Sequence, residues 1–218
     1  MAKKLITALL TLTLIACSTI SIYAAETTTD TDTQTNADGQ LTQEEKEEWA
    51  KEKAEEKAKA EKKAKEKLKN GLAAYIRKIN PNISKTKSKT MAGYFISKGE
   101  KYNLDPKVLM AIAQNESTFY TNAKSPYGYK GLMQTSDSLA RKYGYKPSSL
   151  YKANVSIEVG ARYLSTMKKQ FKTYTKAISA YAYGEGTVKS GNYSKALANK
   201  ILKTRSSITT YLKKNNYV

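Results

Sequence analysis

The chain has 218 residues, 40% of them hydrophobic, and its 38 Lys and Arg residues outnumber 19 Asp and Glu residues, which gives a formal net charge of +19. This length accommodates one globular domain with appendages. The sequence contains no His and a single Cys, which excludes a Ser-His-Asp triad, a Cys-His pair, a His-ligated metal site and an internal disulfide. We expect neither a metal nor a cofactor.

Residues 1–24 have the organisation of an export signal, because two Lys residues precede a short apolar run. The motif Leu-Ile-Ala-Cys at residues 14–17 resembles the lipobox of bacterial lipoproteins, in which the Cys becomes the lipidated first residue. Lipidation of Cys17 would attach the protein to a membrane. Cleavage near residues 24 and 25 is the alternative, and it would release a soluble protein. In both cases we expect the mature protein in the cell envelope.

Two polar segments follow the signal. Residues 25–40 are mostly Thr, Asp, Asn and Gln, with almost nothing to bury, so we predict a disordered linker. Residues 41–70 contain nine Glu and ten Lys, many of them four positions apart, but only Trp49 and Leu68 as large apolar residues. Because there is no apolar seam for a coiled coil, we interpret this segment as a lone charged helical spacer. A disordered charged tail is the alternative.

Residues 71–218 are predicted to form one all-α domain, because no segment shows the turn-punctuated alternation of a β-meander. The first helix continues or restarts over residues 72–79 and ends before Asn80, and a basic loop follows at Lys85–Lys89. A small irregular region is expected between Thr121 and Lys130. Further helices are predicted over residues 91–102, from Asp105 onward, over 135–142, 154–171 and 177–183, and as one or two helices over 195–211.

Local signals set the expected ends and faces of these helices. Thr135 or Ser136 can cap one helix and Asn154 another, whereas Gly184 and Gly186 are expected to end the helix before them. The side chains predicted to face the core are those of Phe95, Ile96, Ile157, Ala161, Leu164 and Met167.

The helix that begins after Asp105 carries the best catalytic candidate. Asp105 can cap this helix, and Leu109 and Ile112 lie on one apolar stripe that Glu116 continues. Burial and the negative end of the helix dipole should both raise the pKa of Glu116 toward the range of a general acid. In the alternative interpretation the helix ends there and Glu116 extends into solvent.

Elimination supports Glu116. From Asn70 onward there are six carboxylates against 26 Lys and Arg, a local net charge of +20. Asp105 serves as a cap, Asp137 fits the first turn of the next helix, and Glu100 lies between Lys residues and is expected at the surface. Glu116 is the best candidate that remains.

Four ordered motifs resemble the signature of the lytic transglycosylase family, a relative of goose-type lysozyme. They are Glu116-Ser117 with Phe119, Ala123, Ser125 and Gly128; Gly131-Leu132-Met133-Gln134; Asn154-Val155 with Gly160, Tyr163 and Leu164; and Ala180-Tyr181-Ala182-Tyr183-Gly184-Glu185-Gly186-Thr187-Val188. The resemblance covers roughly a hundred residues. It implies a lysozyme-like domain over residues 71–218 that binds and cleaves peptidoglycan.

The resemblance also implies residue roles. Glu116 matches the catalytic acid and Ser117 the hydroxyl beside it, which we expect to contact the sugar, while Met133 and Gln134 match residues that line the sugar cleft. Tyr181 matches a Tyr whose hydroxyl reaches the catalytic carboxyl. In the family mechanism the acid protonates the oxygen between N-acetylmuramic acid and N-acetylglucosamine, and then acts as a base while a 1,6-anhydro ring closes.

Aromatic rings that also carry hydroxyls suit sugar binding. Seventeen Tyr residues are present, and we place Tyr127, Tyr129, Tyr181 and Tyr183 in or near the cleft. The alternative for each is a half-buried core position, and for the first two the interpretations are equally supported.

The sequence departs from the family pattern at three positions. Ala182 stands where the family usually has Asn, which removes an amide near the site, and Glu185 stands in place of Pro. Glu185 could position water and favour hydrolysis, or it could be a solvated loop residue, which we favour. Asp137 replaces a common Pro with little consequence expected.

The strong positive charge would by itself suggest nucleic acid. Export argues against that partner, and the cell wall offers acidic peptides and polymers that would attract the same surface. We therefore expect a monomer that binds peptidoglycan strands and no nucleic acid. The alternatives are a hydrolytic muramidase that uses the same acid, and a non-catalytic wall-binding adaptor of a secretion system.

Overall fold

The structure, a computed structural model, describes residues Thr42–Val218. The predicted export signal, the lipidation site Cys17 and the linker over residues 25–40 lie outside the described residues. The chain divides into two units between Lys51 and Glu52, and the packing described below is that of the second unit.

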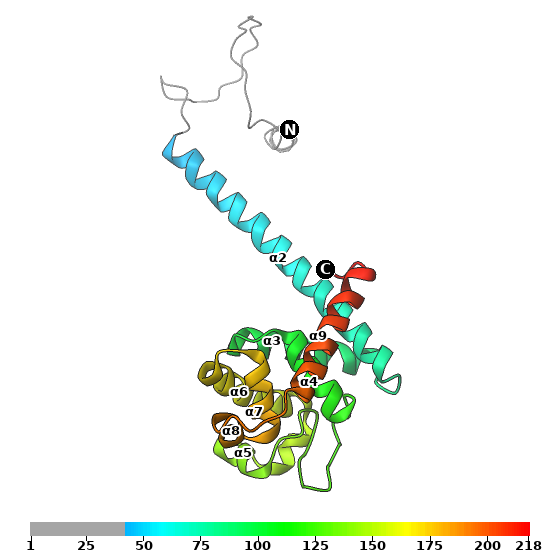
Figure 1. Ribbon diagram of the computed structural model, residues 1–218. Helices are drawn as coiled ribbons and strands as arrows, with labels where there is room; N and C mark the ends of the chain where they lie inside the picture. Colours follow the sequence, from blue (N-terminus) through cyan, green and yellow to red (C-terminus); the bar gives the residue numbers. More distant parts are fainter. Residues whose placement is uncertain (1–41) are drawn as a thin grey trace, which may run out of the picture. The chain divides into compact units, whose positions relative to one another are not determined.

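The described residues are mainly helical (Figure 1). The elements are α2 (Gln43–Ile79), α3 (Lys85–Tyr102), α4 (Pro106–Ser117), α5 (Asp137–Lys142), the short 3-10 helix η1 (Pro147–Tyr151), α6 (Ala153–Phe171), α7 (Tyr174–Tyr183), α8 (Glu185–Lys189) and α9 (Ala196–Lys214). Extended pairing in this part is limited to isolated bridges from Lys130 to Lys124 and to Thr135. The all-α prediction is confirmed, and none of these helices has an apolar stretch that could span a bilayer.

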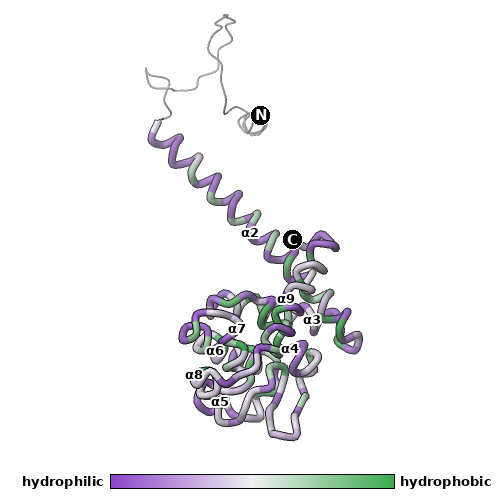
Figure 2. Tube along the Cα trace, viewed as in Figure 1, coloured by the Kyte–Doolittle hydropathy of each residue, from purple (hydrophilic) through white to green (hydrophobic). Residues whose placement is uncertain are grey.

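α2 continues from the charged segment into the domain without a break. Its N-terminal part is mostly hydrophilic (Figure 2), whereas Leu72, Ala73 and Ile76 near its C-terminus are fully buried. The helix ends at Ile79, as predicted, where the next residue, Asn80, leaves the helical pattern. The apolar residues therefore attach the last two turns of α2 to the core.

α3 begins earlier than the sequence indicated. The predicted basic loop Lys85–Lys89 is wrong, because these residues form the first turn of the helix. Ser84 caps that turn, since its hydroxyl accepts a hydrogen bond from the backbone N–H of Lys87 at 3.3 Å. Phe95 and Ile96 are buried as expected.

α4 lies at the centre of the domain and packs against α3, α6 and α9. Asp105 caps it as predicted, accepting from the N–H of Lys107 at 2.9 Å, and its other carboxylate oxygen pairs with Arg205 of α9 at 2.7 Å. The sequence suggested one apolar stripe, but every residue from Val108 to Ala113 is buried. A helix buried on all sides can place its C-terminal residues with little freedom.

The C-terminal helices differ from the prediction in two details, and α9 takes one of the two forms expected. Asn154 does not cap α6, because the helix already begins at Ala153 and Asn154 lies in its first turn. α7 ends at Gly184, which has a φ of 90°, but Gly186 lies inside α8 and ends nothing. α9 is a single helix. The predicted inward face of α6, represented by Leu164, is buried.

Candidate active site

Glu116 occupies the last turn of α4, where the chain turns sharply. Thr118 and Phe119, directly after the helix, adopt left-handed conformations with φ values of 51° and 63°. The amide of Asn80 at the end of α2 donates to the carbonyl of Thr118 at 2.9 Å and holds this turn. Strained backbone beside a candidate catalytic group is a feature of many active sites.

The carboxyl of Glu116 is half-buried, and its environment favours the protonated form. Burial raises the pKa of Glu116 above its ordinary value, although a hydrogen bond from the amide of Asn115 and the positive charge of Lys200 oppose the increase. The other five carboxylates between Asn70 and Val218, all described, form ion pairs; Glu116 forms none. It is therefore the acid of the domain best suited to deliver a proton.

Two residues predicted to contact sugar lie in the interior instead. The hydroxyl of Ser117 donates to the carbonyls of Ala113 at 3.0 Å and Leu132 at 2.8 Å, so it joins α4 to the loop that follows. Met133 is fully buried, and its N–H donates to the hydroxyl of Ser156 on α6 at 3.0 Å. Both residues therefore hold the backbone around the site through hydrogen bonds inside the domain.

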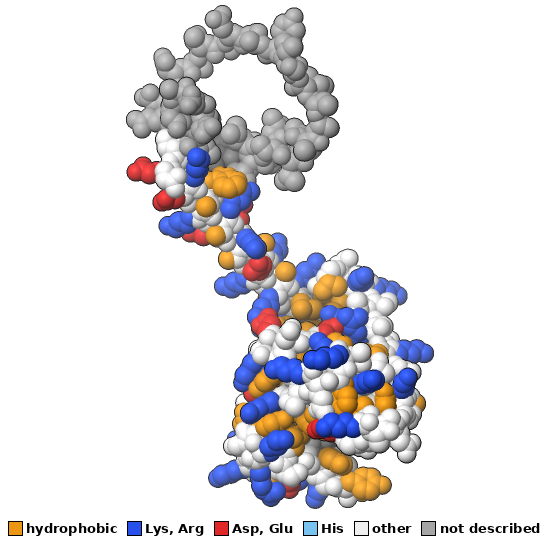
Figure 3. Space-filling model, turned by 60° about the vertical axis from the view of Figure 1, so that its left-hand side comes forward, with side chains coloured by type: hydrophobic (Ala, Val, Ile, Leu, Met, Phe, Trp, Pro, Cys, Tyr) orange, Lys and Arg blue, Asp and Glu red, His pale blue; other side chains and the backbone are white. Residues whose placement is uncertain are grey.

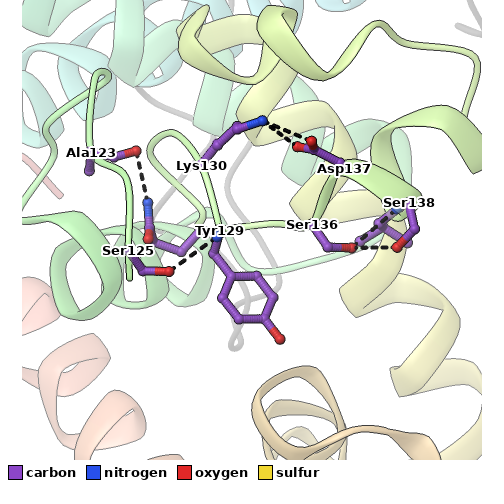
Figure 4. Close-up of polar contacts among 9 residues, drawn as sticks. Ala123, Ser125, Tyr129, Lys130, Ser136, Asp137 and Ser138 are labelled. Carbon is purple, nitrogen blue, oxygen red and sulfur yellow. Dashed lines mark hydrogen bonds and ion pairs between the residues drawn. The ribbon is translucent and has the colours of Figure 1, made fainter. Parts of the chain in front are cut away.

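The loop between α4 and α5 is fixed by its own polar contacts. Gln134 has a φ of 44°, and its side-chain amide donates to the carbonyls of Ala123 at 3.2 Å and Gly131 at 2.8 Å. Lys130 pairs with Asp137 at 2.7 Å, and the ring of Tyr129 points away from this ion pair (Figure 4). These contacts tie the predicted irregular region to the residues that lead into α5.

A cavity of about 390 Å³ lies between this loop with the start of α5 on one side and the end of α7 on the other. Four residues predicted to lie in or near the sugar cleft line it, namely Tyr129, Gln134, Tyr181 and Tyr183. Tyr127 is 88% exposed and does not line it. Tyrosine rings thus line the cavity, and rings of this kind suit sugar binding.

Tyr181 connects the cavity with Glu116. Burial raises the pKa of the Tyr181 hydroxyl well above its ordinary value, and the negative charge of Glu116 raises it further. The hydroxyl donates to the carbonyl of Met133 at 2.7 Å, so its hydrogen-bond partner is this backbone group and not the Glu116 carboxyl expected from the resemblance. Glu116 itself does not line the cavity. Tyr181 therefore lines the cavity and is also close enough to Glu116 for the charge of that carboxyl to act on it.

Two positions that depart from the family pattern lie nearby. Ala182 lines the cavity with no polar group. Glu185 pairs with Lys189 and accepts a hydrogen bond from the amide of Gln170 at 2.8 Å, contacts that lower its pKa. Its carboxylate is engaged at the surface and does not line the cavity.

Sequence reasoning missed several residues of the cavity. Tyr163 of α6 lines it and packs against Tyr181 with ring centroids 5.4 Å apart, yet the sequence offered Tyr163 only as part of a motif. Ser136, Ser138 and Lys142 also line it. The sequence indicated only that these three residues belong to one short helix and its cap. Among the described residues, no three carboxylates or cysteines are grouped as a metal ion would require.

Comparison with known proteins identifies the class. A family model described as the transglycosylase SLT domain matches residues 93–202, half of the chain. The membrane-bound lytic murein transglycosylase E of Buchnera aphidicola is 30% identical over 156 residues, which cover 63% of this chain and 71% of the relative. The chain therefore belongs to the transglycosylase SLT domain family.

Solved structures of longer enzymes are also similar. The lytic transglycosylase Slt of Pseudomonas aeruginosa, solved as an inactive mutant, is 24% identical with a TM-score of 0.45 over 57% of this chain and 24% of that chain. The 70-kDa soluble lytic transglycosylase of Escherichia coli is 24% identical with a TM-score of 0.46 over 67% of this chain and 29% of that chain. The present chain spans less than a third of either.

Proposed function

We propose that the protein is an exported lytic transglycosylase that cleaves the bond between N-acetylmuramic acid and N-acetylglucosamine in peptidoglycan and leaves 1,6-anhydromuramic acid ends. The observation that carries this proposal is the state of Glu116: a half-buried carboxyl with a raised pKa and no ion pair, next to Tyr181 at the cavity. Family membership supports the same reaction class.

Glu116 acts first as an acid and then as a base. Its proton passes to the glycosidic oxygen while the N-acetyl group of the muramic acid attacks the anomeric carbon, so the leaving sugar departs as an alcohol. The Glu116 carboxylate then removes the proton of the C6 hydroxyl, which displaces the N-acetyl oxygen and closes the anhydro ring. This sequence needs a single protein carboxyl, in contrast to the carboxylate pairs of most glycosidases.

Cleft residues hold the sugar for this step. We assign sugar binding to four residues that line the cavity, namely Tyr129, Gln134, Tyr181 and Tyr183. Ser117 and Met133 hold the site from the interior.

The N-terminal segments give the domain its location. We propose export through a signal that ends before Cys17, attachment through lipidated Cys17, and reach through the linker 25–40 and the charged helix at 41–70. The catalytic domain follows over residues 71–218.

A hydrolytic muramidase is the second candidate, since Glu185 could serve as the base that activates water. Its contacts with Lys189 and Gln170 and its lowered pKa argue against this role. Mass spectrometry of the muropeptides distinguishes the two reactions, because an anhydro product is one water lighter than a reducing-end product. A non-catalytic adaptor would bind sacculi and release nothing.

Replacement of the proposed acid tests the function. We expect Glu116→Gln to lower release of soluble muropeptides from purified sacculi by roughly 10²- to 10⁴-fold, the usual contribution of general acid catalysis. Glu185→Gln is the matched control and should leave both the rate and the anhydro product unchanged. An unchanged rate for Glu116→Gln would exclude the proposal.

Thermal unfolding shows whether that variant is folded. A raised folded-state pKa means that Glu116 contributes stability below its unfolded pKa and loses it as the pH rises through the folded pKa. At pH 7 this stability has been lost, because a charged carboxylate is then partly buried. The neutral Gln carries no such charge, so the unfolding temperature of the variant should equal or exceed that of the unmodified protein.

A further inference from the structure

A second cavity, of about 440 Å³, shares no lining residue with the first. It is bounded by the start of α3, by the segment Phe119–Thr121 directly after the Glu116 helix, and by the start of α6. Phe119 is three residues beyond Glu116, so the turn that positions the proposed acid also forms one wall of this second cavity.

One part of the wall is apolar and aromatic. Met91, Tyr94 and Phe119 line it, and Tyr120, with 49% of its surface exposed, stands at its edge. The amide of Asn82 donates to the hydroxyl of Tyr120 at 3.3 Å and orients that ring. A surface of this kind binds small apolar groups such as the methyl side chains of alanine.

The rest of the wall carries groups that pair with a peptide backbone. Asn82 and Asn154 offer amides, and Thr86 and Thr90 offer hydroxyls. Each amide can both donate and accept hydrogen bonds. Together with the apolar patch, they match a short peptide better than a bare sugar ring.

Lysines make this region electropositive. Lys87 lines the cavity, and Lys85 and Lys89 line an adjoining hollow that shares Thr86 and Thr90 with it. None of these three lysines forms an ion pair within the described residues, and Glu100, Glu158 and Asp105 pair with other lysines. Uncompensated cations beside an apolar cavity favour an anionic partner.

We propose that this second cavity, with Lys85, Lys87 and Lys89 at its rim, binds the acidic stem peptide of peptidoglycan. The inference rests on the proposed function, since the peptide is attached to the muramic acid that the first site acts on. Stem peptides combine alanine methyl groups with several free carboxylates, which is the pairing of apolar wall and lysine rim described above. A polymer of glycerol phosphate has the charge but no apolar side chains for Met91 and Phe119.

Calorimetric titration of the mature protein with a free stem tetrapeptide, alanyl-γ-glutamyl-diaminopimelyl-alanine, tests the proposal. We expect Lys87→Glu and Tyr120→Ala each to raise the dissociation constant at least about tenfold, which corresponds to a loss of about 1.4 kcal/mol of binding free energy. The matched controls are Lys203→Glu, an exposed lysine of α9, and Tyr127→Ala, an exposed tyrosine outside both cavities. They should change affinity less than about twofold.

Three results would overturn the inference: no binding of the tetrapeptide to the unmodified protein, unchanged binding by Lys87→Glu, or displacement of the peptide by a glycerol phosphate oligomer that binds more tightly. Chitotetraose binding should be unaffected by Lys87→Glu, because that neutral sugar belongs to the first cavity. The inference and the proposed function fail separately: tetrapeptide binding is measured without turnover, and loss of turnover in Glu116→Gln is measured without the peptide site.

Discussion

At the scale of single residues, Gly131 determines how closely the loop approaches α6. Its φ of 76° is in the left-handed region, and a Cβ placed there would lie 1.9 Å from the carbonyl oxygen of Leu150 and 2.8 Å from the hydroxyl of Ser156. Ser156 in turn accepts from the N–H of Met133. A side chain at Gly131 would therefore push the loop away from the helix that positions it.

Gly131→Ala should destabilise the domain by at least about 2 kcal/mol, because it combines an unfavourable φ with a backbone clash. Gly128→Ala is the control, since Gly128 has a φ of 84° but no atom within 4 Å of an added Cβ. It should lose only about 1 kcal/mol. Urea unfolding of both variants measures the difference, and equal losses would contradict the close-approach explanation.

At the scale of elements, Glu158 connects α6 to α3. The residue is 5% exposed, and its carboxylate pairs with Lys98 at 2.6 Å and Lys101 at 2.7 Å and accepts a hydrogen bond from Tyr102. Burial alone would raise the pKa of Glu158, but the hydrogen bonds from Lys101, Lys98 and Tyr102 lower it to about 2. The carboxylate is therefore charged in the folded protein at any ordinary pH.

Glu158→Gln should cost about 2–3 kcal/mol at pH 7, less than a fully buried pair because both lysines reach solvent. Glu100→Gln, which breaks an exposed pair with Lys65, is the control and should cost under about 1 kcal/mol. Urea unfolding at pH 7 compares the two.

The pH dependence of stability is a second measurement on Glu158→Gln. The folded pKa of about 2 is below the ordinary value of 4.5, so the stabilisation is complete above about pH 5 and is lost as the pH falls from 4.5 toward 2. The difference in unfolding free energy between the unmodified protein and Glu158→Gln should shrink over this range. A constant difference would show that the lysine contacts do not control this carboxyl.

At the scale of the whole molecule, positive charge dominates the surface. Lys and Arg side chains are distributed over the domain face drawn in Figure 3, and from Asn70 onward they outnumber acids by 26 to 6. Five of those six acids are already paired with bases of the protein, so the excess is available to an external anion. Peptidoglycan carries such anions on its peptides.

Raising NaCl from 50 to 500 mM should weaken binding of Glu116→Gln protein to sacculi by roughly tenfold, because salt screens charges at the surface. Co-sedimentation with sacculi measures the bound fraction while the inactive variant leaves the wall intact. Binding of neutral chitotetraose is the control and should not respond to salt. Salt-independent sacculus binding would show that the surface charge does not attract the wall.

The helices show which features of the fold can be predicted from sequence. Local features were predicted well: the Asp105 cap, the end of α2 before Asn80, and the buried faces of α3 and α6. Each depends on residues within one or two helical turns. The basic run Lys85–Lys89 was predicted as a loop, but it forms the first turn of α3, which Ser84 caps.

The sequence by itself determined the all-α class, the family motifs and Glu116 as the best candidate for a catalytic acid. Only the tertiary structure decided that Tyr181 donates to Met133, 48 residues away, that Glu158 meets Lys101, 57 residues away, and that a second cavity opens beside the Glu116 turn. The physical reason is the distance along the chain over which each interaction acts. Caps and periodicity act between neighbours along the chain, whereas hydrogen-bond partners, burial and cavities arise only when distant segments pack together.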